Sequence, residues 1–154
     1  MCGKDEARLM GMYENYTRQA LPSKYYRELL GTSLCVFNSN TAFIIENILR
    51  FSRQSEYNWY ALIDCTSGQL AIPIKNTIAQ SSPEIAELFE ELAAKRNRIV
   101  HSFQITDMDG AQRLATKTKV KDGNEQFVVT ENYLLDFIKQ NERLAGELHN
   151  LRGY

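Results

Sequence analysis

The chain has 154 residues, of which 44% are hydrophobic and 24% are charged, with eight glycines and three prolines. This composition excludes the collagen-like, intrinsically disordered and disulfide-scaffold classes. Eighteen basic and nineteen acidic residues give a formal net charge of −1 at pH 7. Binding of nucleic acid by overall positive charge is therefore excluded, and any contact with phosphate must come from a local basic cluster.

The length predicts one domain that spans residues 1–154, because a chain of this size buries enough surface to need no metal or disulfide. No apolar run approaches the ~18–20 residues that cross a bilayer. The first residues, Met-Cys-Gly-Lys-Asp-Glu-Ala-Arg, do not read as a secretory signal. Three widely spaced cysteines (Cys2, Cys35 and Cys65) are typical of a reducing compartment. We expect a soluble, cytoplasmic protein that contacts no membrane.

Two helices are predicted in the first third of the chain. Apolar residues recur at helical spacing over residues 4–19, and Leu21-Pro22 ends this segment because a residue before proline disfavours the helical conformation. Ser23 can cap a second, long helix whose apolar positions recur every three or four residues as far as Phe51. The polar stretch 38–40 leaves a kink or a second N-cap open in its middle.

The central region predicts shorter elements and then another long helix. Residues 57–65 read as a short helix, whereas residues 69–80 are ambiguous because Pro73 argues against a long uninterrupted one. Ser82-Pro83-Glu84 is a helix start, with a capping serine, a proline at the first helical position and an acidic first turn. This helix is expected to run to about Ser102.

The pattern then changes to alternation, over residues 113–121 and again over 126–130, and Asp122-Gly123 between them predicts a two-residue hairpin turn. The alternation would place Arg113, Lys117, Lys119 and Lys121 on one exposed face. Such a basic ribbon suits phosphate contact and equally suits protection of a sheet edge against aggregation.

A last helix is expected from about residue 130 to Gly153. The predicted fold is all-α, a four- to five-helix bundle with one small β-hairpin between the last two helices.

Only two histidines can supply a group that titrates near neutral pH. His149, near the end of the last helix, reads as a solvated surface residue. His101 instead follows Lys95-Arg96-Asn97-Arg98, and Arg96 falls in the centre of the apolar stripe of its helix. A charge there needs a partner, either a bound phosphate, backbone carbonyls or a carboxylate such as that of Glu46. Asn97 and His101 share a different face, beside small residues that would let a second helix or protomer approach.

The pattern Arg96-Asn97-x-x-x-His101 in the penultimate long helix resembles the Arg-x4-His motif of the HEPN superfamily (higher eukaryotes and prokaryotes nucleotide-binding domains). The resemblance implies a metal-independent endoribonuclease that acts as a homodimer with one composite site and holds no cofactor. It implies that His101 is the general acid or base, that Arg96 stabilises the transition state, and that Asn97 positions phosphate or imidazole. Contacts to the RNA substrate are expected from Lys95, Arg98, Lys117, Lys119 and Lys121.

The biological role that the resemblance suggests is that of a toxin or a phage-defence effector, with an antitoxin or a nucleotidyltransferase as partner. Phe103 stands where toxins of this kind often carry a modified tyrosine, so control by that modification is not expected. Two alternatives remain. The first is a non-catalytic nucleotide-binding or partner-binding module of the same fold. The second is a structural helical dimer in which Arg96 is salt-bridged and His101 has no role.

Overall fold

The computed structural model describes residues 13–52 and 56–153, and the predicted helix at residues 4–19 therefore lies largely outside the described part. Residues 13–16 form a short 3₁₀ turn, and no helix follows them before Ser23. The other elements, in chain order, are α2 (Lys24–Phe51), α3 (Trp59–Ile63), α4 (Ala71–Asn76), α5 (Pro83–Val100), β1 (Phe103–Thr106), β2 (Gln112–Lys117), β3 (Gln126–Val129) and α6 (Glu131–Arg152).

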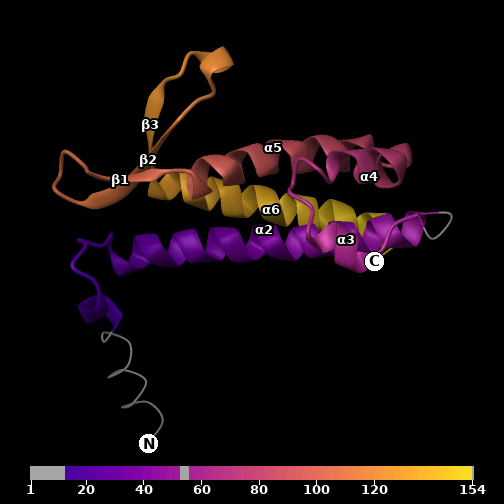
Figure 1. The fold of residues 1–154 in the computed structure, drawn as a ribbon, viewed down its shortest axis with the longest axis horizontal. Coiled ribbons are helices and arrows are strands. Elements are labelled where there is room, and N and C mark those ends of the chain that lie inside the picture. Colours follow the sequence, from indigo (N-terminus) through magenta and orange to yellow (C-terminus); the bar gives the residue numbers. More distant parts are fainter. Residues whose placement is uncertain (1–12, 53–55, 154) are drawn as a thin grey trace, which may run out of the picture.

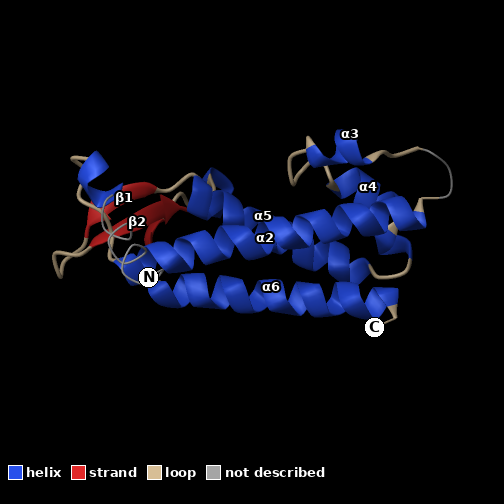
Figure 2. Cartoon of the chain, turned by 90° about the horizontal axis from the view of Figure 1, so that it is seen from below, coloured by secondary structure: helices blue, strands red, loops and turns tan. Residues whose placement is uncertain are grey.

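The long helices α2, α5 and α6 form the body of the molecule. They lie roughly along one direction, with the short helices α3 and α4 at one end and the β-strands at the other (Figure 1). A view from below shows α2 beside α6 over most of their lengths (Figure 2). The ring of Phe37 on α2 stacks on Phe89 of α5 and on Phe137 of α6, with centroids 5.8 and 6.2 Å apart. These three buried rings join the three helices in one core.

Helix α2 is one continuous helix, so neither a kink nor a second start occurs in its middle. Ser23 caps it as predicted, with its side chain accepting a hydrogen bond from the backbone N–H of Tyr26. The polar stretch does not interrupt the helix because Asn40 is buried against α6. Its amide donates to the backbone oxygen of Asn141 at 2.8 Å and to the side-chain oxygen at 3.1 Å. The two buried side chains thereby satisfy each other's polar groups between α2 and α6.

The remaining helix predictions agree with the structure except at their ends. Residues 57–65 contain the short α3, and residues 69–80 divide into α4 and a 3₁₀ turn rather than forming one helix. Helix α5 begins at Pro83 as predicted, although the Ser82 side chain makes no capping hydrogen bond. Thr130 caps α6, and Gly153 ends it in the left-handed conformation. Within residues 13–52 and 56–153, no helix is both long and apolar enough to cross a membrane.

The prediction of a single β-hairpin was incomplete. The structure has a three-stranded antiparallel sheet in the order β1-β2-β3. Strand β1 was missed because it is four residues long and largely exposed, so it shows no clear alternation. The predicted two-residue turn was also wrong. Strand β2 ends at Lys117, and residues 118–125 form a longer loop in which Asp122-Gly123 closes a 3₁₀ turn, with the Gly123 φ at +100°.

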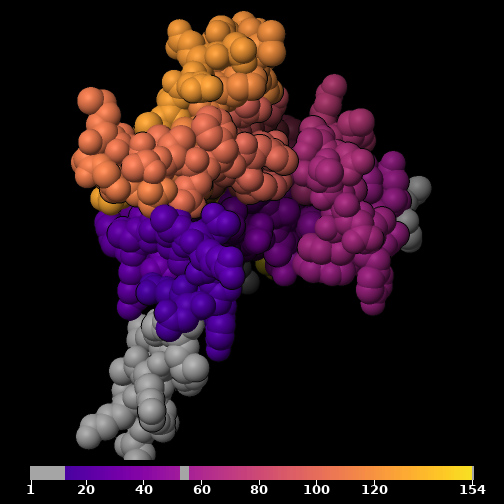
Figure 3. All heavy atoms as spheres, turned by 60° about the vertical axis from the view of Figure 1, so that its left-hand side comes forward, coloured from indigo at the N-terminus to yellow at the C-terminus, as the bar shows by residue number. Residues whose placement is uncertain are grey.

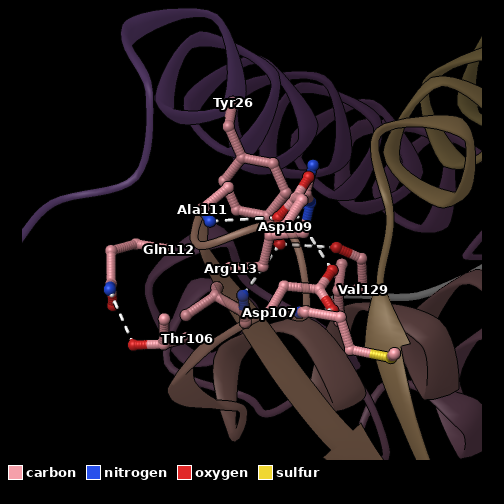
Figure 4. A network of polar contacts seen from close by, with 10 residues as sticks. Tyr26, Thr106, Asp107, Asp109, Ala111, Gln112, Arg113 and Val129 are labelled. Atoms are coloured by element: carbon pink, nitrogen blue, oxygen red, sulfur yellow. Dashed lines mark hydrogen bonds and ion pairs between the residues drawn. The ribbon is translucent and has the colours of Figure 1, made fainter.

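The sheet is fixed to the start of α2 by Tyr26, whose side chain reaches across to two strands (Figure 4). Its hydroxyl donates to the Val129 carbonyl at 2.5 Å and accepts from the Leu114 N–H at 3.0 Å. Nearby, Arg113 contacts Asp107 at 3.1 Å and Asp109 at 2.9 Å in the β1–β2 connection. Arg113 is therefore engaged by carboxylates and does not belong to the exposed basic ribbon that the alternation predicted.

We expect Tyr26→Phe to lower the free energy of unfolding by about 1–3 kcal/mol, because it leaves two backbone groups of the sheet without their partner. Urea denaturation followed by circular dichroism measures this change. Tyr25→Phe is the matched control, since Tyr25 is half exposed and its change should stay within about 0.5 kcal/mol. Equal stability of the two variants would show that the Tyr26 hydroxyl does not hold the sheet.

The same hydroxyl makes stability sensitive to alkaline pH. Burial raises the pKa of Tyr26 above its ordinary value of 10.0, although the hydrogen bond from Leu114 partly opposes this. The folded chain thus keeps the phenol proton to higher pH than the unfolded chain does. This contribution to stability is complete below pH 10 and is lost as pH rises from there through the folded-state pKa. Burial also raises the pKa of Tyr133, so Tyr26→Phe should reduce this alkaline loss without abolishing it.

Candidate active site

The motif residues lie at the C-terminal end of α5. Asn97 begins its last helical turn, Arg96 directly precedes that turn, and His101 is the residue that caps the helix. The backbone N–H of His101 still donates to the Asn97 carbonyl at 3.0 Å. The position of His101 is therefore set by the helix although its φ and ψ, −95° and 21°, have left the helical values.

Arg96 lies among apolar side chains, as its place in the helix stripe predicted. Its guanidinium carbon is 5.2 Å from the centre of the Phe37 ring, and its Nη2 donates to the Ser67 hydroxyl at 2.8 Å. Its Nε is buried and has no hydrogen-bond partner. Within the described ranges, no carboxylate forms an ion pair with this guanidinium, and Glu46 instead lies 3.6 Å from Arg152. The alternative ion pair between Arg96 and Glu46 is therefore not formed.

A groove between α4 and α5, here called the helix groove, is lined by Asn97 but not by Arg96 itself. It has a volume of about 490 Å³. Ser67, the hydrogen-bond partner of Arg96, lies in its wall. Asn97 lines the same groove together with three charged residues, which are Lys75 of α4, Glu90 of α5 and Lys119 of the β2–β3 loop. The small residues beside Asn97, Ala93 and Ala94, also line this groove. Its apolar part as a whole consists of Gly68, Ala71, Ile74, Ala79, Ala86, Phe89, Ala93 and Ala94.

His101 is exposed and does not line the helix groove. On an α-helix, side chains five residues apart point about 140° away from each other. In agreement with this, Arg96 points toward α2 and Ser67, whereas His101 projects at the helix end. One protomer alone therefore does not bring the Arg96 guanidinium and the His101 imidazole together. The second histidine, His149, is exposed, with its ring 5.0 Å from that of Phe43.

Four of the five residues predicted to contact RNA line a second depression of about 250 Å³, here called the basic groove. Lys95, Arg98, Lys119 and Lys121 surround it, together with Asp122 and Phe127 from the β2–β3 region. The fifth, Lys117, lies outside it, where its ammonium donates to Asn124.

Two of these cations also have partners within the chain. The Lys95 ammonium contacts Gln140 at 2.7 Å and Glu91 at 3.2 Å. One Arg98 nitrogen donates to the Lys117 carbonyl at 2.8 Å, which fixes the end of α5 against β2. Lys119 and Lys121 are exposed in the loop and remain the most available for an anionic ligand.

The sequence matches no protein-family model, no curated protein has a significant match to it, and no solved structure resembles the chain significantly. Within the part of the chain that the structure describes, no group of three histidine, cysteine, aspartate or glutamate side chains is placed to hold a metal ion.

Sequence reasoning missed the contribution of the α3–α4 region to this site. Ser67 belongs to an ordinary Thr-Ser-Gly turn, and nothing in that triplet indicates that its hydroxyl meets a guanidinium 29 residues later. The only signal was indirect. An arginine in an apolar stripe requires some polar partner, and that requirement did not identify the side chain that meets it.

Proposed function

We propose that this protein is a metal-independent endoribonuclease of HEPN type that acts as a homodimer with a composite site. The observation that carries the proposal is the state of Arg96. Its half-buried guanidinium lies over the Phe37 ring with no carboxylate partner in the described part of the chain, and its hydrogen-bond partner Ser67 lines a groove that Asn97 also lines. A cation kept in such a place without a counter-ion is suited to receive an anion, and a phosphodiester is the anion that the motif suggests.

The chemistry follows from the side chains in this arrangement. The imidazole of His101 would remove the proton from a ribose 2′-hydroxyl. The 2′-oxygen of that ribose would then attack the adjacent phosphorus. The bond from phosphorus to the 5′-oxygen would break, and the second protomer's imidazole would donate the proton that this leaving oxygen needs. Arg96 would stabilise the added negative charge on the phosphoryl oxygens, and Asn97 would hold the phosphate or an imidazole. The products would carry a 2′,3′-cyclic phosphate and a 5′-hydroxyl.

A homodimer is required because Arg96 and His101 diverge within one chain. Pairing two α5 C-terminal ends would let the guanidinium of one protomer face the imidazole of the other. It would also place two basic grooves at one site, which explains how a chain with a net charge of −1 could hold RNA. In this proposal the biological setting is a cytoplasmic toxin or phage-defence effector. An antitoxin or a nucleotidyltransferase would be its partner.

The proposal is tested by incubating a labelled single-stranded RNA with the protein in EDTA and identifying the new ends. We expect cleavage that leaves a 2′,3′-cyclic phosphate, and no cleavage of a DNA strand of the same sequence, which lacks the attacking hydroxyl. His101→Ala protein purified in parallel controls for a contaminating ribonuclease. An intact RNA after incubation with a folded wild-type dimer would contradict the proposal and favour a non-catalytic binding module.

A further inference from the structure

The helix groove and the basic groove are parts of one continuous surface along α5. Ala94 and Lys119 line both of them. Figure 3 shows the β2–β3 hairpin and the α3–α4 segment protruding on different sides of the molecule, with a recess between them. A ligand with an apolar part next to an anionic part could therefore occupy both grooves at once, with the apolar part in the helix groove and the anionic part in the basic groove.

The helix groove has the properties of a site for a mostly apolar group with polar edges. Its volume of about 490 Å³ lies within the range of small-molecule sites, and most of its wall is aliphatic. Ser67 is only 9% exposed, and its oxygen already accepts from Arg96, so its own O–H remains to donate to a ligand. The Asn97 side-chain amide, which can both donate and accept, makes no hydrogen bond within the described residues. A nucleobase presents the matching donors and acceptors on its edge.

The basic groove has the properties of a site for the backbone that would follow such a base. Arg98, Lys119 and Lys121 surround it, against the single carboxylate of Asp122. Lys95 also lies there but is engaged by Glu91 and Gln140. The excess of available cations favours phosphate over a cationic or neutral ligand.

We infer that the protein binds single-stranded RNA, with one unstacked base in the helix groove and the neighbouring phosphates in the basic groove. This inference rests on the proposed function for RNA as the ligand and deepens it by naming the substrate class. In a duplex the bases are paired and stacked, so insertion of one would first require breaking those contacts. A single strand offers its bases without that cost, and the groove therefore selects against duplex RNA.

The test is fluorescence anisotropy with His101→Ala protein, so that binding is measured without cleavage. The probes are a 12-nucleotide RNA, its duplex, an abasic ribose-phosphate strand of the same length, and AMP. We expect the single strand to bind about tenfold more tightly than the duplex or the abasic strand, which is the scale of one base contact. Equal affinity for single strand and duplex would overturn the inference, as would AMP binding as tightly as the strand.

Variants that fill the groove give the second arm of the test. Ala71→Leu with Ala86→Leu narrows the helix groove from α4 and from α5, at an exposed and a half-buried position that do not line the basic groove. We expect about a tenfold loss of affinity for the single strand and little change for the abasic strand. Ala61→Leu, an exposed alanine on α3 outside both grooves, is the matched control. An unchanged affinity of the filled variant for the single strand would overturn the placement of the base.

The salt dependence tests the placement of the phosphates. Each lysine that neutralises a phosphate of a single strand contributes about −0.7 to the slope of log affinity against log salt. Lys119→Ala and Lys121→Ala should each reduce the slope by about that amount. An unchanged slope in both would overturn the basic groove as the phosphate site. Because these measurements record binding and not cleavage, absence of catalysis in the wild type would contradict the proposed function alone.

Discussion

Replacing His101 with alanine is expected to lower the single-turnover rate of RNA cleavage by about 10²–10⁴-fold, the usual contribution of a general acid or base. His101 is exposed at the end of α5, and the alanine keeps its backbone hydrogen bond to Asn97. The free energy of unfolding should therefore change by no more than about 0.5 kcal/mol. Rapid-quench cleavage assays and urea denaturation measure the two quantities separately.

His149→Ala is the matched control, because His149 is the other histidine of the sequence and lies on α6. We expect it to cleave at the wild-type rate. If His101→Ala also cleaves at that rate, the imidazole of His101 takes no part in catalysis and the candidate site is wrong. If both variants are slow, the effect is not specific to the motif.

Replacing Arg96 with methionine is expected to lower the cleavage rate by about 10²–10³-fold while leaving the fold nearly as stable as before. The methionine keeps an unbranched apolar chain against Phe37. It loses the hydrogen bond to Ser67 and the cation–π contact, worth about 1–2 kcal/mol together, but it also removes a buried Nε that has no partner. These changes offset each other, so we expect the free energy of unfolding to change by less than about 1 kcal/mol.

The opposite outcome identifies a structural arginine. If Arg96→Met were strongly destabilised but the remaining folded protein still cleaved RNA at the wild-type rate, Arg96 would serve packing and not catalysis. Arg96→Lys adds a second comparison, since lysine keeps the charge but has no planar fork of donors. We expect its cleavage rate to stay well below that of the wild type.

Mixing the wild type with an equal amount of His101→Ala tests the composite site. The proposed site needs an imidazole from each protomer, so a mixed dimer lacks one of the two. Before exchange half of the dimers are wild type, and after random exchange a quarter are, so we expect the cleavage rate of the mixture to fall by about half. An unchanged rate after confirmed subunit exchange would contradict a site shared between protomers.

Local sequence signals predicted the helices well because the groups that start and stop a helix are neighbours in the chain. Ser23 and Thr130 both accept from a backbone N–H three residues later, and Gly153 ends α6 with a positive φ. The apolar spacing as far as Phe51 likewise predicted the length of α2, which ends at that residue. Strand β1 was beyond this reasoning because it is short, is largely exposed and depends on hydrogen bonds to β2.

Distant contacts decided what the sequence left open. Judged from its neighbours in the sequence, Asn40 predicts a break or a cap within α2. In the structure it is buried in one continuous helix because it donates to Asn141, which lies 101 residues away in the sequence. Tyr26 similarly finds its partners 88 and 103 residues away.

For the candidate site, the sequence alone determined that Arg96 would occupy an apolar stripe, that Asn97 and His101 would lie on another face, and that basic residues would gather nearby. These features depend on helical periodicity, which is a local property of the chain. Only the tertiary structure decided that Ser67 rather than Glu46 meets the guanidinium. It also decided that α4 and α5 enclose a groove and that Lys119 joins this groove to the basic one. Such contacts depend on how separate elements pack, and no local pattern encodes them.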